Sequence, residues 1–222
     1  PGIQLGIPQG AAPCIRCAPG HPERVSRMIL YGGFPRGWKR RDSPAAQREY
    51  QAMVDLMGLA WGKDNPTFRQ LFTSRFIPGG SLEQLQWFND LCLKTTSGEI
   101  AATLQEARGE VDILGELGKV TTPTLVLHAR DDAVVPIREG RLLAGGIPGA
   151  EFVELHSRNH ILLEHEPAWQ RFCVAVLAFL GAGEPIGDSA FAALSARGPQ
   201  VLGLMADGLS NADIGERLQI SE

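Results

Sequence analysis

Two side chains with acid and base chemistry follow two apolar runs of the sequence. Asp132 comes shortly after the run 123–129 (PTLVLHA), and His160 comes shortly after the run 151–155. The first run is nearly all apolar, which is typical of a strand buried on both faces. In an open parallel sheet, catalytic groups gather at the carboxyl ends of such strands. A carboxylate there can hold an imidazole in one tautomer, so that the ring acts as a base towards a nucleophile. The structural alternative is that Asp132 caps the next helix and His160 is a loop histidine.

Three other groups of residues have weaker chemical patterns. Cys14 and Cys17 form a lone C-x-x-C, which could be a redox pair, but we interpret them as two small residues that face the sheet. A zinc site would need further Cys or His residues at ligand spacing. His21 is interpreted as a helix end, and the basic run 36–41 as a solvated loop rather than a phosphate or RNA site. We therefore expect no metal and no cofactor.

The elements that must position Asp132 and His160 alternate between strands and helices. Apolar runs at 3–7 and 24–33 predict two strands joined through a helix that ends near Pro19. From residue 34 to about 117, apolar residues recur at spacings of three and four, which predicts a helical insertion. Further on, the run 151–155 predicts a strand, and a helix begins near Pro167. Because parallel strands need crossover connections, this order predicts an α/β fold with a parallel sheet.

Segments of the chain also resemble the α/β-hydrolase fold in their order and spacing. They are GIPQG at 6–10, HPERVSRMILYGG at 21–33, PTLVLHARDDAVVP at 123–136 and SRNHILLEHEP at 157–167. The resemblance covers residues 1–181. In that family the catalytic residues follow the order nucleophile, acid, histidine. The resemblance therefore implies that Asp132, four residues before Pro136, is the acid and that His160 is the base. It also implies that the insertion at about 34–117 is a helical cap over the active site.

The sequence departs from the family at the nucleophile, which should be the central serine of G-x-S-x-G. Pro8 occupies that position, and the backbone of Gln9 takes the place of an oxyanion donor. Proline has no nucleophilic group, and its ring locks φ near about −65°, whereas this position has a positive φ in the family. We also expect the earlier strands and their oxyanion loop to be absent. Because one lost oxyanion donor costs about 10²-fold to 10³-fold in rate, we expect catalysis to be impaired.

A second pattern, LSxR…VLxLxAxGLSNxxI…LxIS, covers residues 194–222 after a linker at 182–193. It resembles the LuxR-type helix-turn-helix, although any small helical hairpin is the alternative. Ser210 or Asn211 would cap its second helix and Ser221 would begin its third, so these three are candidate DNA-binding residues. We expect the recognition helix, which reads base edges, to follow Glu222. From residue 188 onward the segment has two basic and five acidic side chains, and this negative balance predicts weak DNA binding by this segment.

Composition limits the class of protein. The chain has 222 residues, 44% of them hydrophobic, and a formal net charge of −4. This fits one full domain with a small appendage and argues against a protein that coats nucleic acid by charge alone. No apolar run approaches the roughly 20 residues that span a bilayer, and the start lacks the features of a signal peptide. With only four cysteines, the chain suits a reducing compartment, so we expect a cytoplasmic protein without membrane contact.

Two functions follow as hypotheses. The first is a fragment of a LuxR-family transcription regulator whose α/β-hydrolase-like domain is a sensor with impaired catalysis. Its partners would be DNA through a completed helix-turn-helix, a small molecule under the cap, and a second copy of the chain. The second is an α/β-fold hydrolase, esterase-like and of the Ser-His-Asp type, or a non-functional remnant of one. The sequence leaves open whether the chain is an enzyme.

Overall fold

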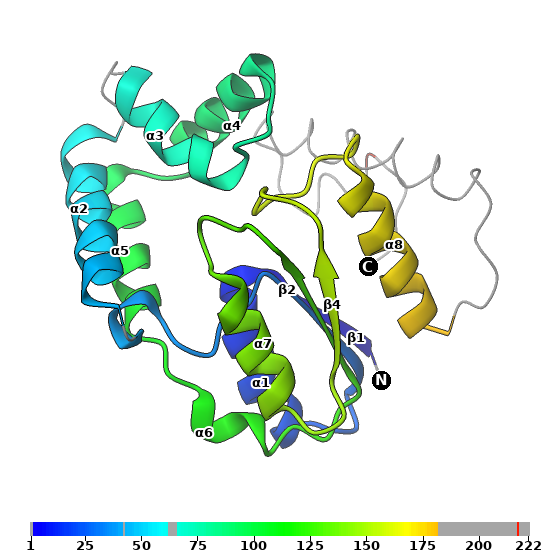
Figure 1. The fold of residues 1–222 in the computed structure, drawn as a ribbon. Coiled ribbons are helices and arrows are strands. Elements are labelled where there is room, and N and C mark those ends of the chain that lie inside the picture. Colours follow the sequence, from blue (N-terminus) through cyan, green and yellow to red (C-terminus); the bar gives the residue numbers. More distant parts are fainter. Residues whose placement is uncertain (1, 42, 62–65, 182–216, 218–222) are drawn as a thin grey trace. The chain divides into compact units, whose positions relative to one another are not determined.

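The computed structural model describes residues 2–41, 43–61, 66–181 and Arg217 (Figure 1). The chain divides into two compact units, residues 1–180 and 181–222. Of the second unit only Gly181 and Arg217 are described. The candidate DNA-binding residues Ser210, Asn211 and Ser221 therefore lie outside the described residues, as does the linker that we expect at 182–193.

The first unit is built on a four-stranded parallel sheet with the strand order β1-β2-β3-β4. The strands are β1 Gly2–Gly6, β2 Val25–Tyr31, β3 Thr124–Ala129 and β4 Glu151–Leu155. In register, Leu30 of β2 lies beside Gly6 on one side and Val126 on the other. β3 is buried along its whole length, as its apolar run predicts. The predicted α/β class with a parallel sheet is confirmed.

β1 forms one edge of this sheet, because among the described residues it pairs with β2 alone. Its apolar side chains are not covered: Ile3 is 54% exposed and Leu5 is 52% exposed. Ile7, directly after the strand, is 54% exposed. β2, which pairs with β1, is buried from Met28 onward. The core of this unit therefore lies beneath β2 and β3, not beneath β1.

Helices cover both faces of the sheet, with α1 and α7 on one side and α8 on the other (Figure 1). These helices are α1 Ala11–Cys17, α7 Ile137–Gly146 and α8 Pro167–Phe179, and a short helix, α6 Leu114–Leu117, contacts α1 and α7. The first face packs Ile15, Met28, Leu30 and Leu143 together. The second face packs Ile29 and Leu127 against residues of α8. Burying apolar side chains on both faces provides the main driving force for folding this α/β layer.

The connection between β1 and β2 differs from the single helix that the sequence predicts. A 3-10 turn at Pro8–Gly10 precedes α1, and a second 3-10 turn at Ala18–Gly20 follows it. α1 thus ends before Pro19, as proline requires. Cys14 packs against the core but Cys17 is exposed. Our interpretation that both cysteines face the sheet was therefore wrong for Cys17.

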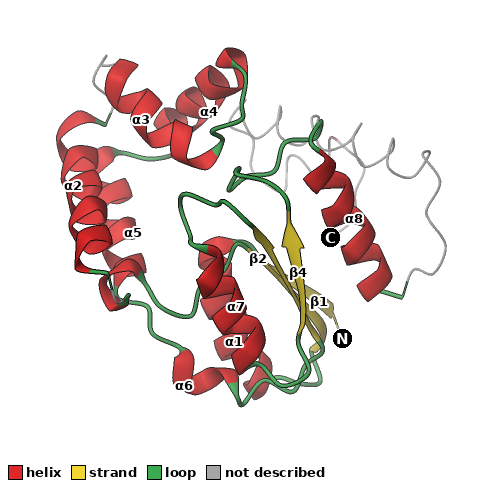
Figure 2. Cartoon of the chain, viewed as in Figure 1, coloured by secondary structure: helices red, strands yellow, loops and turns green. Residues whose placement is uncertain are grey.

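The segment between β2 and β3 holds a layer of helices set apart from the sheet (Figure 2). It consists of α2 Pro44–Ala60, α3 Pro66–Phe76, α4 Leu82–Thr95 and α5 Gly98–Gly109. Serine side chains cap three of these helices: Ser43 accepts from the N–H of Ala46, Ser97 from that of Ile100, and Ser81 forms a capping box with Gln84. Each cap satisfies an N–H group that has no partner within the helix. We call α2 to α5 the cap helices.

The basic run 36–41 is not the solvated loop that we expected. Trp38 is buried, and its indole N–H donates to the carbonyl oxygen of Gln105 at 2.9 Å. Arg36 pairs at 3.2 Å with the fully buried carboxylate of Glu139 in α7. Lys39 contacts Glu106 and Glu110 of α5. The run therefore joins the entrance of the cap helices to α5 and α7 through ion pairs that the sequence pattern did not reveal.

Candidate active site

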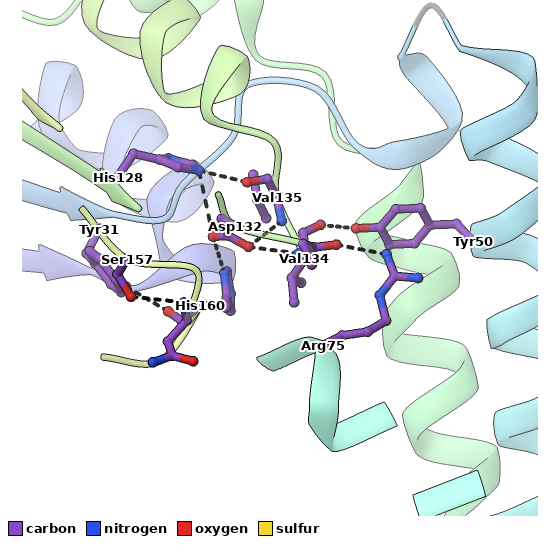
Figure 3. Close-up of polar contacts among 11 residues, drawn as sticks. Tyr31, Tyr50, Arg75, His128, Asp132, Val134, Val135, Ser157 and His160 are labelled. Atoms are coloured by element: carbon purple, nitrogen blue, oxygen red, sulfur yellow. Dashed lines mark hydrogen bonds and ion pairs between the residues drawn. The ribbon is translucent and has the colours of Figure 1, made fainter. Parts of the chain in front are cut away.

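Asp132 and His160 lie in hydrogen-bond contact at the carboxyl ends of β3 and β4. Oδ2 of Asp132 is 2.6 Å from Nδ1 of His160 (Figure 3). Oδ1 of the same carboxylate accepts the backbone N–H groups of Val134 at 2.7 Å and Val135 at 2.9 Å. Asp132 thus satisfies the turn that leads into α7 and orients the histidine at the same time. The structure brings together the two residues that the sequence singled out.

The contacts of Asp132 favour its charged form. Burial opposes ionisation of this carboxyl, but the hydrogen bonds that it accepts from Nδ1 of His160 and from the N–H of Val135 outweigh burial. As a result the pKa of Asp132 lies below its ordinary value. An ionised Asp132 only accepts hydrogen bonds, so Nδ1 of His160 must be the donor. We infer from this contact that Nε2 is the basic nitrogen of a neutral His160.

The loop that carries His160 is held from two sides. On the sheet side, the hydroxyl of Tyr31 in β2 donates to the carbonyl oxygen of His160 at 2.8 Å. On the cap side, the backbone N–H of His160 donates to the carbonyl oxygen of Phe76 at 2.8 Å. The Phe76 ring also meets the imidazole edge-to-face, with ring centres 5.5 Å apart. These contacts fix the ring in position and exclude water from one side of it.

The sequence analysis missed a second histidine at this site. His128 in β3 is fully buried, and its Nε2 lies 2.8 Å from the carbonyl oxygen of Val135 and 3.8 Å from Oδ2 of Asp132. Because a carbonyl oxygen can only accept, Nε2 must carry the proton. Burial lowers the pKa of His128, so this ring stays neutral. Its polar side chain within an apolar run is the sequence signal for this residue.

Pro8, which we expected at the nucleophile position, lies near His160. Gly32 has φ of +61°, and a Cβ placed on it would lie 3.3 Å from Cε1 of His160 and 3.5 Å from Cγ of Pro8. Both rings thus lie close to Gly32, at a position where a side chain would crowd both. Proline carries no group that His160 could deprotonate. His160 consequently has its acid partner, Asp132, but no nucleophile at residue 8.

The backbone at Pro8 also takes a relaxed path. Ile7 is extended, and Pro8 occupies the first position of the 3-10 turn, where the N–H of Gly10 donates to the carbonyl oxygen of Ile7 at 2.6 Å. The first positions of a helical turn suit proline, because its fixed φ is already helical and no N–H is needed there. Gln9, the candidate oxyanion donor, lies at the second position of this turn and is exposed.

Within the described ranges, no group of three His, Cys, Asp or Glu residues could hold a metal ion. In the same part of the chain, no helix is both long and apolar enough to cross a membrane.

Several proteins of known class are similar to this chain in sequence or in fold. An "AB hydrolase superfamily protein", YisY of Bacillus subtilis, is 30% identical over 161 residues, which cover 71% of this chain and 59% of YisY. A 2-hydroxy-6-oxononadienedioate/2-hydroxy-6-oxononatrienedioate hydrolase of Cupriavidus pinatubonensis is 27% identical over 183 residues, covering 80% of this chain and 61% of that protein. An esterase from Exiguobacterium antarcticum superposes with a TM-score of 0.67 at 21% identity, covering 81% of this chain and 66% of the esterase. The first unit of the chain has the α/β-hydrolase fold.

The carboxyl-terminal segment matches a different family. Residues 192–222 match the family model described as "Bacterial regulatory proteins, luxR family". Both resemblances stated from the sequence are therefore confirmed, the α/β-hydrolase fold and the LuxR-type segment. The chain spans about three fifths of the length of the curated hydrolase relatives that it matches.

Proposed function

We propose that this chain belongs to a LuxR-type DNA-binding regulator, in which the α/β-hydrolase-fold unit is a sensor with impaired catalysis. The observation that supports this most is Pro8, which lies beside His160 in a chain whose residues 192–222 match the luxR family. As partners we propose DNA, a small molecule under the cap helices and a second copy of the chain. We also propose Asp132 and His160 as site residues, with Ser210, Asn211 and Ser221 toward DNA.

The geometry supports binding without turnover. In the Ser-His-Asp scheme, the histidine takes a proton from the serine as the serine attacks the carbonyl carbon. Here Nδ1 of His160 is committed to Asp132, and the neighbouring residue 8 offers no proton and no attacking atom. A ligand carbonyl at this position would find no nucleophile in residue 8. Nε2 of His160 would instead accept a hydrogen bond from the ligand, so the ligand would be held and released unchanged.

Hydrolysis of an activated ester tests the proposed loss of catalysis. We expect the unmodified chain to hydrolyse p-nitrophenyl acetate no faster than its His160→Ala variant. The Pro8→Ser variant restores a hydroxyl beside the base, and His160→Ala in the Pro8→Ser background shows how much of any gain uses that base. Turnover by the unmodified chain that His160→Ala or Asp132→Asn abolishes would contradict the sensor with impaired catalysis.

DNA binding by the complete gene product tests the regulator. We expect sequence-selective binding whose affinity falls steeply as salt rises, because phosphate contacts release counterions from DNA. The matched control carries Ser210→Ala and Asn211→Ala, which leave the hydrolase-fold unit intact. If the complete product binds no DNA fragment more tightly than random sequence, the regulator proposal fails.

A hydrolase remains the second candidate, and a specific contact favours it. The 2.6 Å hydrogen bond between Asp132 and His160 is the acid and base arrangement of that chemistry. Without a serine, such an enzyme would have to use His160 to activate water directly. The ester assay separates the two candidates, since only the hydrolase predicts turnover that depends on His160. The non-functional remnant predicts neither turnover nor binding, so binding of DNA or of a ligand would argue against it.

A further inference from the structure

A narrow cavity lies between the cap helices and the loop of Asp132. Its walls come from α2, α3 and α5 and from Val134, and they are mostly apolar, with Met53, Met57 and Phe72 among them. The empty space, including its open mouth, is about 340 Å³, and little of it is wide enough for a water molecule. Methionine side chains can adapt to an incoming group. A small, slender ligand would therefore enter this cavity as these side chains move apart.

Arg108 of α5 lines this cavity as a buried cation without an anion. Only 8% of the residue is exposed, and no described residue forms an ion pair or a hydrogen bond with its guanidinium. The ring of Phe34 lies close to the guanidinium, with its centre 5.0 Å from Cζ. Burial lowers the pKa of Arg108, yet a guanidinium stays charged at neutral pH. An unpaired buried charge is costly, so the site favours an anion.

The neighbouring charges do not meet this need. Arg75 lines the same cavity, but it pairs with Glu49 at 2.7 Å and donates to the carbonyl oxygen of Ala133 at 2.9 Å. Arg41 lies over the same Phe34 ring, 5.6 Å from its centre, and its positive charge opposes that of Arg108. Asp132 is attractive to Arg108, but its two oxygens are engaged by His160 and the backbone. The surroundings of Arg108 therefore carry excess positive charge.

We propose that this cavity binds a small organic carboxylate, with its carboxylate group on Arg108 and its apolar chain against Met53, Met57 and Phe72. A guanidinium presents parallel N–H donors that match the two oxygens of a carboxylate. A monoanion fits better than a phosphate dianion, because one unpaired guanidinium in an apolar wall offers too few donors for the larger charge. That this ligand is the regulator's signal rests on the proposed function, whereas the binding site itself does not.

Val134 would lie between the bound ligand and Asp132. The hydroxyl of Tyr50, which lines the cavity, donates to the carbonyl oxygen of Val134, and the N–H of Val134 donates to Asp132 (Figure 3). On the other side Phe76 lines the cavity and contacts the His160 ring. Occupation of the cavity would thus act directly on the residues that position Asp132 and His160.

Calorimetry on the full chain tests the ligand class with two probes of the same shape, hexanoate and hexanamide. Hexanamide keeps the planar head and the apolar chain but has no charge. Because hydrogen bonds to charged groups are stronger than neutral ones, we expect hexanoate to bind at least about tenfold more tightly. Equal affinities, or no saturable binding of hexanoate, would overturn the proposal. This comparison needs no variant, so it decides the matter even if replacing Arg108 prevents folding.

Arg108→Met then tests the anchor, because methionine keeps much of the length of the side chain without its charge. We expect this variant to bind hexanoate about tenfold to 100-fold more weakly, with hexanamide binding unchanged. Arg141→Met, at an exposed position on α7, is the matched control and should bind hexanoate as the unmodified chain does. Unchanged hexanoate binding by Arg108→Met would assign Arg108 to packing on Phe34 alone. Neither DNA nor ester enters these assays, so they can fail while the regulator proposal stands, and the reverse.

Discussion

The carboxylate of Asp132 accepts hydrogen bonds within its own loop and from the loop of His160. The stability of the protein at low pH should therefore depend on the charge of Asp132. Its pKa in the folded state lies below the ordinary value of 3.8. An acid with a lowered folded pKa contributes stability above its unfolded pKa and loses it as pH falls through the folded pKa. We expect Asp132→Asn to lower the free energy of unfolding by about 1–3 kcal/mol at neutral pH. The difference should shrink below about pH 4. Urea unfolding of both proteins from pH 7 to pH 3 measures it, and a constant difference would contradict the assigned charge.

Titration of His128 should make the free energy of unfolding depend on pH over a higher range than titration of Asp132 does. Burial holds its folded pKa below the ordinary value of 6.5, so the unfolded chain takes up a proton first as pH falls. Stability is then complete above the unfolded pKa and declines below it, by at most about 1.4 kcal/mol per pH unit. His128→Gln keeps a donor for the carbonyl of Val135 but does not titrate. Its unfolding free energy should decline less between pH 6.5 and pH 5 than that of the unmodified chain, and equal slopes would refute the role given to His128.

At this scale the sequence predicted residues that end strands and missed residues that lie inside elements. Asp132 and His160 were found because the carboxyl ends of parallel strands meet at one edge, whatever the details of packing. Pro8 was found because it occupies the central position of a motif with fixed spacing. His128 and Arg108 were missed because the sequence does not show that these polar side chains are buried. His128 is buried by the packing of α7, and Arg108 packs on Phe34. In the sequence, Arg108 resembles an ordinary helix residue, and His128 is marked only as a polar residue within an apolar run.

Among the elements, α7 shows how closely a helix approaches the sheet. A Cβ on Gly140 would lie 2.4 Å from Nδ1 of His128, whereas a Cβ on Gly145 in the same helix would meet nothing within 4 Å. We therefore expect Gly140→Ala to destabilise the protein by about 1–3 kcal/mol through overpacking. Gly145→Ala should instead stabilise it by about 0.5–1 kcal/mol, because alanine is the better helix former. Thermal unfolding of the two variants gives the comparison, and a common sign would contradict this packing of α7.

The elements themselves were predicted well where period and length agreed. The run 123–129 and the run 151–155 became β3 and β4, and the helix near Pro167 became α8. The run 36–41 was misjudged, because its exposure depends on Glu106, Glu110 and Glu139, which are distant in sequence. Charge patterning along the chain cannot reveal a partner that only the fold brings near.

For the whole molecule, the order of strands and helices predicted the fold class, and motif spacing predicted the family. The sequence did not predict how the cap helices attach to the sheet unit. They do so through backbone atoms of the two site loops, since Arg75 and Tyr50 donate to the carbonyls of Ala133 and Val134, and Phe76 accepts from His160. Backbone contacts leave no side-chain pattern at the accepting positions, so no sequence signal marks them.

The exposed edge strand β1 has a consequence for the purified protein. A strand with one unpaired edge and bare apolar side chains offers a template on which a strand of another molecule can add. We expect residues 1–222 to self-associate as concentration rises, with light scattering that increases faster than concentration. Leu5→Lys should suppress this, because a charge on an edge strand opposes such addition. Leu59→Lys, which changes a leucine 66% exposed on α2, should not. Equal scattering by the two variants would mean that association begins elsewhere. In solution, then, the association of residues 1–222 should depend on one short strand.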